Sequence, residues 1–129
     1  QKSYGRDFAD YAVLVRRRND VKAVKEALRE RGMKCCEVKK DISVRESDKD
    51  AVRIATMQRS RGLEFAGVVV AEINEGVWPL RPEGYADFDP VAKKIADDSE
   101  RSLLYVALSR AINHVMLTGV GTAPAELRA

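Results

Sequence analysis

The sequence predicts an α/β domain of three layers, in which helices cover both faces of a mostly parallel β-sheet. Short apolar runs bounded by charge are typical of strands that are buried on both faces of a parallel sheet. These runs alternate with stretches of helical periodicity, and no internal repeat or low-complexity segment interrupts them. The alternation favours crossover connections between parallel strands. We expect strands at residues 11–15, 35–39, 51–57, 67–71 and 114–118.

Length and composition restrict the class of protein. The 129 residues suffice for one domain with its own core, and we expect residues 1–129 to form that single domain. Lys and Arg outnumber Asp and Glu by 23 to 20, a net charge of +3, which permits nucleic-acid binding without requiring it. No apolar run approaches the ~20 residues that cross a bilayer, and the first residues lack a signal-peptide core, so we expect a cytoplasmic protein without membrane contact. Because Cys35 and Cys36 are adjacent and His114 is the only histidine, no disulfide framework or metal site is predicted.

The first expected strand, 11–15, is followed directly by Arg16-Arg17-Arg18. Open α/β sheets bind ligands at the carboxyl ends of their strands, although arginines in a loop are more often simply solvated. Asn19 or Asp20 is expected to cap the next helix, and Gly32 to end it. The apolar face of that helix is formed by Val21, Val24, Ala27 and Leu28.

A polar, basic loop from Gln58 to Phe65 joins the third and fourth expected strands. Since strands enclose it, we expect it at a ligand-binding edge of the sheet. Glu64 can accept hydrogen bonds from a sugar hydroxyl or pair with a neighbouring arginine, and spacing alone favours the surface pair. In the next loop, Trp78 offers a stacking surface for a base, although a lone tryptophan is more often a core or loop anchor.

The stretch from Ser99 to Gly119 is predicted to form a buried helix followed by a buried strand. Apolar residues at 104, 107, 108, 111 and 112 follow helical spacing, and acidic residues at 97, 98 and 100 suit the helix N-terminus. We expect residues 91–98 to form a separate, short polar helix. Arg110 lies in the last turn, so its guanidinium must reach out of the interior. Either water at the helix C-terminus or a phosphate fits that charge.

Two motifs make the chain resemble superfamily 1 DNA helicases of the UvrD/Rep type. Thr56-Met-Gln-Arg-Ser-Arg-Gly-Leu-Glu-Phe65 is similar to helicase motif V, T-x-H-x-x-K-G-L-E-F, and Leu104-Tyr-Val-Ala-Leu-Ser-Arg-Ala111 is similar to motif VI, Y-V-A-x-T-R-A. Between them, residues 74–79 resemble the N-E-G-x-x-P of that family, and residues 12–16 resemble motif IVa. The resemblance implies a RecA-like fold of the P-loop NTPase type, in the second motor domain of an ATP-dependent helicase. That domain closes on a first RecA-like domain across bound ATP.

The resemblance also implies roles for single residues. Arg110 would contact the γ-phosphate and stabilise the charge of the transition state. Gly62 and Glu64 would bind the nucleotide, with Glu64 on the ribose and Gly62 allowing close approach. Single-stranded DNA, or a junction of single and double strands, would contact four residues: Thr56, Gln58, Arg59 and Arg16.

The chain departs from the family pattern in informative ways. Gln58 replaces the usual histidine of motif V, which keeps hydrogen-bonding capacity but removes a titratable group. No G-x-x-x-x-G-K-[ST] loop and no acidic strand end of the Walker B kind is present. We therefore expect a fragment of a larger helicase that lacks the first RecA-like domain and binds neither ATP nor Mg²⁺ by itself. The alternative is a stand-alone, non-catalytic module that retains the RecA-like fold.

Overall fold

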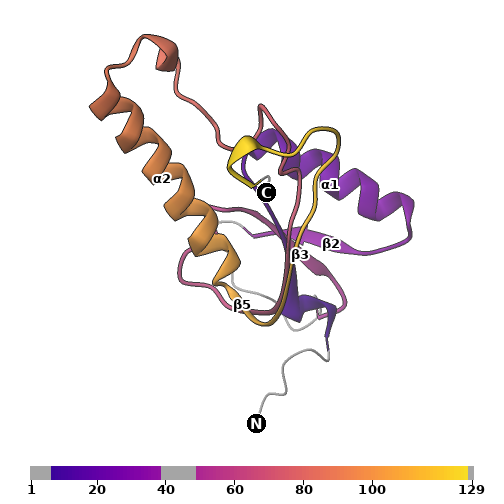
Figure 1. Ribbon diagram of the computed structural model, residues 1–129. Helices are drawn as coiled ribbons and strands as arrows, with labels where there is room; N and C mark the ends of the chain where they lie inside the picture. The colour runs from indigo at the N-terminus through magenta and orange to yellow at the C-terminus, as the bar shows by residue number, and fades with distance from the viewer. Residues whose placement is uncertain (1–6, 39–48, 128–129) are drawn as a thin grey trace.

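A computed structural model describes residues 7–38 and 49–127 of the chain. Five strands form a sheet in the order β2-β3-β1-β4-β5, and every neighbouring pair is parallel (Figure 1). The predicted α/β class with a mostly parallel sheet is therefore confirmed. The strands are β1 (Tyr11–Val15), β2 (Cys35–Glu37), β3 (Val52–Thr56), β4 (Phe65–Val70) and β5 (Ala111–Leu117).

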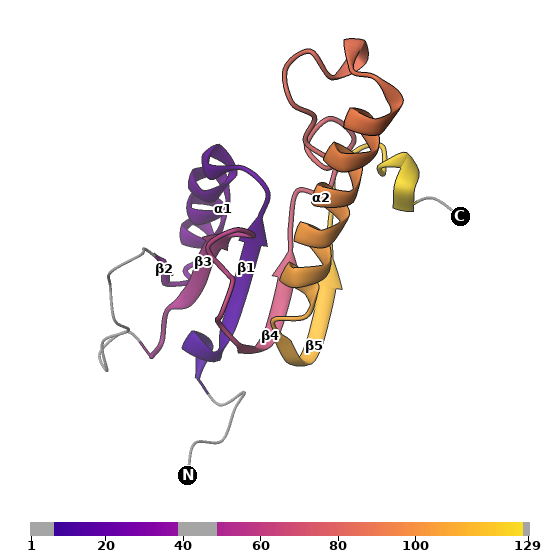
Figure 2. The same ribbon diagram turned by 90° about the vertical axis from the view of Figure 1, so that its left-hand side faces the viewer.

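Helices lie on both faces of the sheet, which gives the expected three layers (Figure 2). Leu14 and Val15 are both fully buried, yet they belong to different cores because adjacent strand residues point to opposite faces. Val15 packs with Val21 of α1 (Arg18–Glu30). Leu14 packs in the core that contains Leu103 of α2 (Pro90–Leu108). The chain is thus wound onto both faces, α1 on one and α2 on the other.

Helix α1 differs from its prediction at its start and at Ala27, which was expected on the apolar face but is exposed. The N-cap residue is Arg17, which makes no side-chain capping bond, rather than Asn19 or Asp20. Asp20 lies in the first turn and instead accepts hydrogen bonds from Arg17 Nε and Nη2, both at 2.9 Å. At the other end, Gly32 takes a left-handed φ of 75° just past the helix, as expected for a C-terminal glycine.

Helix α2 is one continuous helix of 19 residues, not a short polar helix followed by a buried one. Asp89 caps it by accepting a hydrogen bond from the Ala92 amide at 2.8 Å, and Pro90 occupies the first helical turn. The acidic residues at 97, 98 and 100 consequently lie in the middle of the helix. The helix ends at Leu108, so Ala111 and Ile112 belong to β5.

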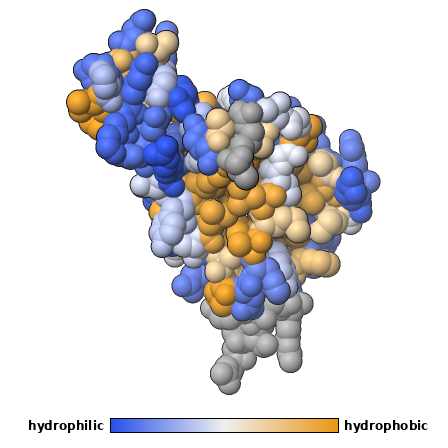
Figure 3. Space-filling model, in the orientation of Figure 1, coloured by the Kyte–Doolittle hydropathy of each residue, from blue (hydrophilic) through white to orange (hydrophobic). Residues whose placement is uncertain are grey.

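Strand β5 is exposed along most of its length, whereas we expected a buried strand. It lies at one edge of the described sheet, and Val115 and Met116 remain 52% and 59% exposed. His114 lies within the strand, not at its end. Hydrophobic residues gather on this side of the molecule, between α2 and α1 (Figure 3). The position of β5 at the edge of the sheet explains why its side chains are exposed. Apolar composition alone does not reveal that a strand lies at an edge.

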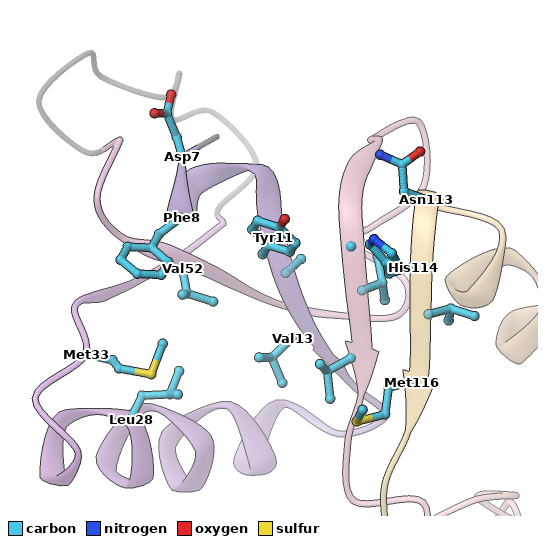
Figure 4. A pocket seen from close by; sticks show the side chains of 15 residues that line it. Asp7, Phe8, Tyr11, Val13, Leu28, Met33, Val52, Asn113, His114 and Met116 are labelled. Atoms are coloured by element: carbon cyan, nitrogen blue, oxygen red, sulfur yellow. The ribbon is translucent and has the colours of Figure 1, made fainter. Parts of the chain in front are cut away.

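An apolar groove of ≈ 1090 Å³ lies beside α1, over the sheet face that α1 leaves uncovered. Leu28 and Met33 form its lower wall, Tyr11 and Val13 come from β1, and Met116 comes from β5 (Figure 4). Its described polar lining residues are Asp7, Tyr11, Asn113 and His114. Among the described residues, no helix is long and apolar enough to cross a membrane.

Candidate functional site

The predicted site residues divide between the two edges of the parallel sheet. Arg16 follows β1, and Thr56 ends β3, so both lie at the carboxyl edge with Gln58 and Arg59. Gly62, Glu64 and Arg110 instead precede β4 and β5 and lie at the amino edge. Because a strand of five or six residues is roughly 17–20 Å long, the candidates form two separate sites.

At the amino edge, a backbone hydrogen bond joins the two motifs that carry Glu64 and Arg110. The Phe65 amide donates to the Arg110 carbonyl oxygen at 2.9 Å, and Phe65 is paired with Ala111 in the sheet. Glu64 and Arg110 therefore precede adjacent strands at matched positions. This is the juxtaposition that motif V and motif VI require if both contact one ligand.

The Arg110 guanidinium is held by neutral oxygens. Its Nε donates to the Val106 carbonyl oxygen at 3.1 Å, and its Nη2 donates to the Ser109 hydroxyl at 3.2 Å. Ser109 is in turn fixed because its hydroxyl donates to Val106 O at 2.8 Å. Across residues 7–38 and 49–127, no carboxylate forms an ion pair with Arg110. The side chain is therefore oriented while its positive charge stays available to an anion.

The other two predicted residues of the amino edge, Gly62 and Glu64, leave space for an anion beside Arg110. Gly62 has a φ of 80°, and no atom of residues 7–38 or 49–127 lies within 4 Å of the position that a β-carbon would occupy. Glu64 is exposed, and the surface ion pair with Arg59 or Arg61 that spacing alone favours is not formed in the described structure. Both residues thus face open space.

At the carboxyl edge, a pocket of ≈ 580 Å³ lies where the winding of the sheet reverses. The connection after β1 crosses toward β2, whereas the connection after β3 crosses back toward β4. Such a switch point opens a crevice in which doubly wound sheets bind ligands. The lining residues are Arg16, Arg17, Arg18, Glu37, Val38, Thr56, Gln58, Arg59 and Leu80.

A rigid turn presents the motif V side chains to this pocket. The Thr56 hydroxyl accepts a hydrogen bond from the Arg59 amide at 3.2 Å, and the buried Ser60 hydroxyl donates to Met57 O at 2.6 Å. Gln58 and Arg59 remain exposed on the outside of the turn. The turn therefore fixes the backbone and leaves both side chains free to reach a ligand.

The arginines of the pocket differ in how their charge is compensated. Arg17 is paired with Asp20, whose hydrogen bond raises the pKa of the guanidinium, and Arg16 is paired with Glu100. Neither Arg18 nor Arg59 has an ion pair within the described parts of the chain. Arg18 was not singled out by the motif comparison, and its signal was only the run of three arginines after β1.

Trp78 is a core residue, not a base-stacking platform. It is 1% exposed, and its indole Nε1 donates to the Glu100 carbonyl oxygen at 3.3 Å. The anchor interpretation is thereby confirmed. The residues that the structure describes contain no group of three His, Cys, Asp or Glu side chains that could hold a metal ion.

The chain forms a doubly wound α/β domain. A basic crevice lies at its switch point, and an available arginine lies at the opposite edge, so each edge offers a place for a ligand. The chain belongs to the family of UvrD-like helicase C-terminal domains, whose model matches residues 34–120. The resemblance to UvrD/Rep-type helicases is therefore confirmed.

Individual relatives agree with this family. The chain is 32% identical over 84 residues to the ATP-dependent DNA helicase Rep of Buchnera aphidicola subsp. Schizaphis graminum (strain Sg). That alignment covers 63% of this chain and only 11% of the helicase. The fold is similar to the crystal structure of the C-terminal domain of a possible DNA helicase from Lactobacillus plantarum WCFS1, with a TM-score of 0.63 and 22% identity over 93% of this chain and 60% of that one.

Proposed function

We propose that this chain is the C-terminal motor domain of an ATP-dependent superfamily 1 DNA helicase or translocase. The observation that carries the proposal is the position of Glu64 and Arg110 on adjacent strands at one edge, linked through the Phe65 amide. Membership of the UvrD-like helicase C-terminal domains supports it. The chain would act with a first RecA-like domain that supplies the phosphate loop and the Mg²⁺ ligands.

The amino edge fits the triphosphate end of a nucleotide. ATP, when bound between the two domains, supplies a γ-phosphate whose charge redistributes during transfer to water. Arg110 would donate to that phosphate through its Nη1, which has no hydrogen bond within the described structure. A permanently charged planar donor suits this purpose because it stabilises the developing negative charge. Glu64 would accept hydrogen bonds from the ribose, and Gly62 would let the backbone approach it.

The carboxyl edge fits a single strand of DNA. Arg18 and Arg59 would neutralise phosphates, while Thr56 and Gln58 would make polar contacts beside them. Arg16 can contribute only through Nη1, because Glu100 engages its Nε and Nη2. Closure of the two motor domains around ATP would then shift this edge along the strand, and hydrolysis would release it.

Substitution of Arg110 tests the nucleotide half of the proposal. In a polypeptide that joins this chain to a phosphate-loop domain, Arg110→Ala should lower kcat for ATP hydrolysis by about 10³-fold or more, by analogy with other arginine fingers. Steady-state turnover in the presence of single-stranded DNA measures the effect. The isolated 129-residue chain should show no turnover, because its sequence has no phosphate loop.

Arg101→Ala provides the matched control. Arg101 lies on the same helix and is exposed, with a long 3.5 Å contact to Asp98, so its loss should leave kcat close to that of the unsubstituted protein. A near-normal rate for Arg110→Ala would defeat the motor assignment. It would favour the stand-alone binding module instead.

A further inference from the structure

A largely buried ion pair lies at the carboxyl edge of the sheet. The Glu100 carboxylate accepts hydrogen bonds from Arg16 Nε at 3.0 and 2.9 Å and from Arg16 Nη2 at 2.6 Å. The exposed fractions of the two side chains are only 13% and 9%. Glu100 Oε2 also accepts a hydrogen bond from the Leu80 amide at 2.9 Å. One residue of α2 therefore holds the end of β1 and the loop that follows Trp78.

Glu100 lies where α2 first meets the body of the domain. No residue from Pro90 to Ser99 is buried, and Glu100 is the first buried residue along the helix. Figure 2 shows the preceding half of α2 extending past the carboxyl ends of the strands. The pair thus lies at the point where α2 begins to pack on the sheet. It is beside the switch-point pocket that Arg16 also lines.

Between Glu100 and the end of α2 at Leu108, every buried residue of the helix is apolar. Its buried residues there are Leu103, Leu104 and Ala107. The hydrophobic effect is non-directional, so apolar burial defines the axial position of a helix less sharply than a hydrogen-bonded pair does. A bidentate hydrogen-bonded ion pair does specify position, because both partners need a fixed distance and orientation. Burial of an ion pair is also weak evidence of net stabilisation, since desolvation offsets the attraction.

The segment from Glu100 to Arg110 can transmit a displacement. From Glu100 the helix continues for eight residues to Leu108, about 12 Å at the rise of an α-helix, and the chain from Glu100 to Arg110 contains neither glycine nor proline. At its lower end, Arg110 is tied to Val106 of the last helical turn and to the Phe65 amide of β4. A shift of the helix at Glu100 would therefore act on the contacts that hold Arg110 near Glu64.

We propose that Arg16 and Glu100 are a positioning pair, which fixes α2 along the sheet and thereby sets where Arg110 lies relative to Glu64. The pair links the pocket at the carboxyl edge to the arginine at the amino edge. This inference rests on the proposed function only for the consequence at ATP. The structural part concerns this chain alone.

Residue-resolved hydrogen exchange on the 129-residue chain tests the structural part. Glu100→Gln keeps the side-chain volume but removes the charge that holds Arg16. We expect the Phe65 and Arg110 amides to exchange about tenfold faster or more, while amides at the centres of β1 and β3 keep their protection. Asp98→Asn removes an exposed carboxylate from the same helix and should change neither group of amides.

Two results would overturn the proposal. One is unchanged exchange at Phe65 and Arg110 in Glu100→Gln, and the other is a uniform loss of protection that extends over β1 and β3, the mark of a general stability role. If Glu100→Gln does not fold, Arg16→Lys replaces it, since lysine keeps the charge without the bidentate geometry. The same two hydrogen-exchange results in Arg16→Lys would then overturn the proposal.

Turnover separates this inference from the proposed function. In the polypeptide with a phosphate-loop domain, Glu100→Gln should lower kcat by about 10- to 100-fold with little change in KM, because misplacement by about 1 Å costs on the order of 10²-fold. If Arg110→Ala keeps its turnover, the proposed function fails. If Arg110→Ala loses turnover while Glu100→Gln does not, only the positioning role fails.

Discussion

At the residue scale, the backbone of Gly62 bears on how closely the proposed nucleotide could approach the amino edge. Its φ of 80° lies in the left-handed region, and the space beside its α-carbon is empty. An alanine there would meet no atom of the described residues within 4 Å, so the backbone conformation is what would resist it. Gly62 therefore combines a conformational requirement with an open surface, as a close contact to a nucleotide needs.

Gly62→Ala should lower the free energy of unfolding by about 1–2 kcal/mol, the cost of a β-carbon in the left-handed region. Urea unfolding of the 129-residue chain measures it. Gly32→Ala is a matched control, because Gly32 has a φ of 75° and equally empty surroundings at the end of α1. Both variants should lose similar stability, but only Gly62→Ala should weaken ATP binding once a phosphate-loop domain is present. Equal ATP binding by the two would remove Gly62 from the site.

At the element scale, the amino-terminal half of α2 is braced by the loop before it. The Tyr85 hydroxyl donates to the Asp97 carboxylate at 2.9 and 3.0 Å, and the Arg81 guanidinium lies 4.3 Å from the centre of the Tyr85 ring. Tyr85 belongs to the short helix η3 (Tyr85–Asp87), which precedes α2. Burial raises the pKa of the Tyr85 phenol above its usual value of 10.0, and the hydrogen bond to Asp97 adds to the increase.

The raised pKa predicts how this brace responds to pH. Because the folded pKa of Tyr85 exceeds the unfolded one, its contribution to stability is fully present below pH 10 and is lost as the pH rises through the folded pKa. Absorbance at the phenolate band, compared between the unsubstituted chain and Tyr85→Phe, isolates this one tyrosine. The difference titration should have its midpoint above pH 10.0. A midpoint at or below that value would contradict the brace.

The two elements that the sequence predicted least well are α2 and β5. Their apolar composition indicated burial correctly for Leu103, Leu104 and Ala107, yet Tyr105 of the same helix is 73% exposed. Periodicity also continued through Ala111 and Ile112, where the chain has already turned into β5. A helical period cannot show where a helix ends without a stop residue, and Ser109 and Arg110 give no such signal. The apolar runs did predict the carboxyl ends of β1 and β3 to within one residue, but β4 and β5 begin at Phe65 and Ala111, two and three residues before their predicted starts.

At the scale of the whole molecule, the topology separates the residues proposed to contact the nucleotide from those proposed to contact the nucleic acid. Motif V begins at the carboxyl end of β3 and finishes at the amino end of β4, so one short segment reaches both edges. Sequence spacing alone placed these residues in a single loop. The separation follows only from the parallel pairing of β3 and β4 with β1 between them. Helix α2 also runs between the carboxyl and the amino edge. The motif V segment and α2 are therefore two parts of the chain that connect the edges.

The nucleic-acid edge makes a prediction of its own. Arg18→Ala and Arg59→Ala should each weaken binding of a fluorescent oligothymidylate and each reduce the slope of log K against log salt by about 0.7, the value for one phosphate of a single strand. Fluorescence anisotropy across a salt series measures both effects on the 129-residue chain. Arg31→Ala removes the same charge at the far end of α1, away from the switch-point pocket, so its slope should equal that of the unsubstituted chain. Equal slopes for all three variants would show that net charge, not the pocket, attracts the strand.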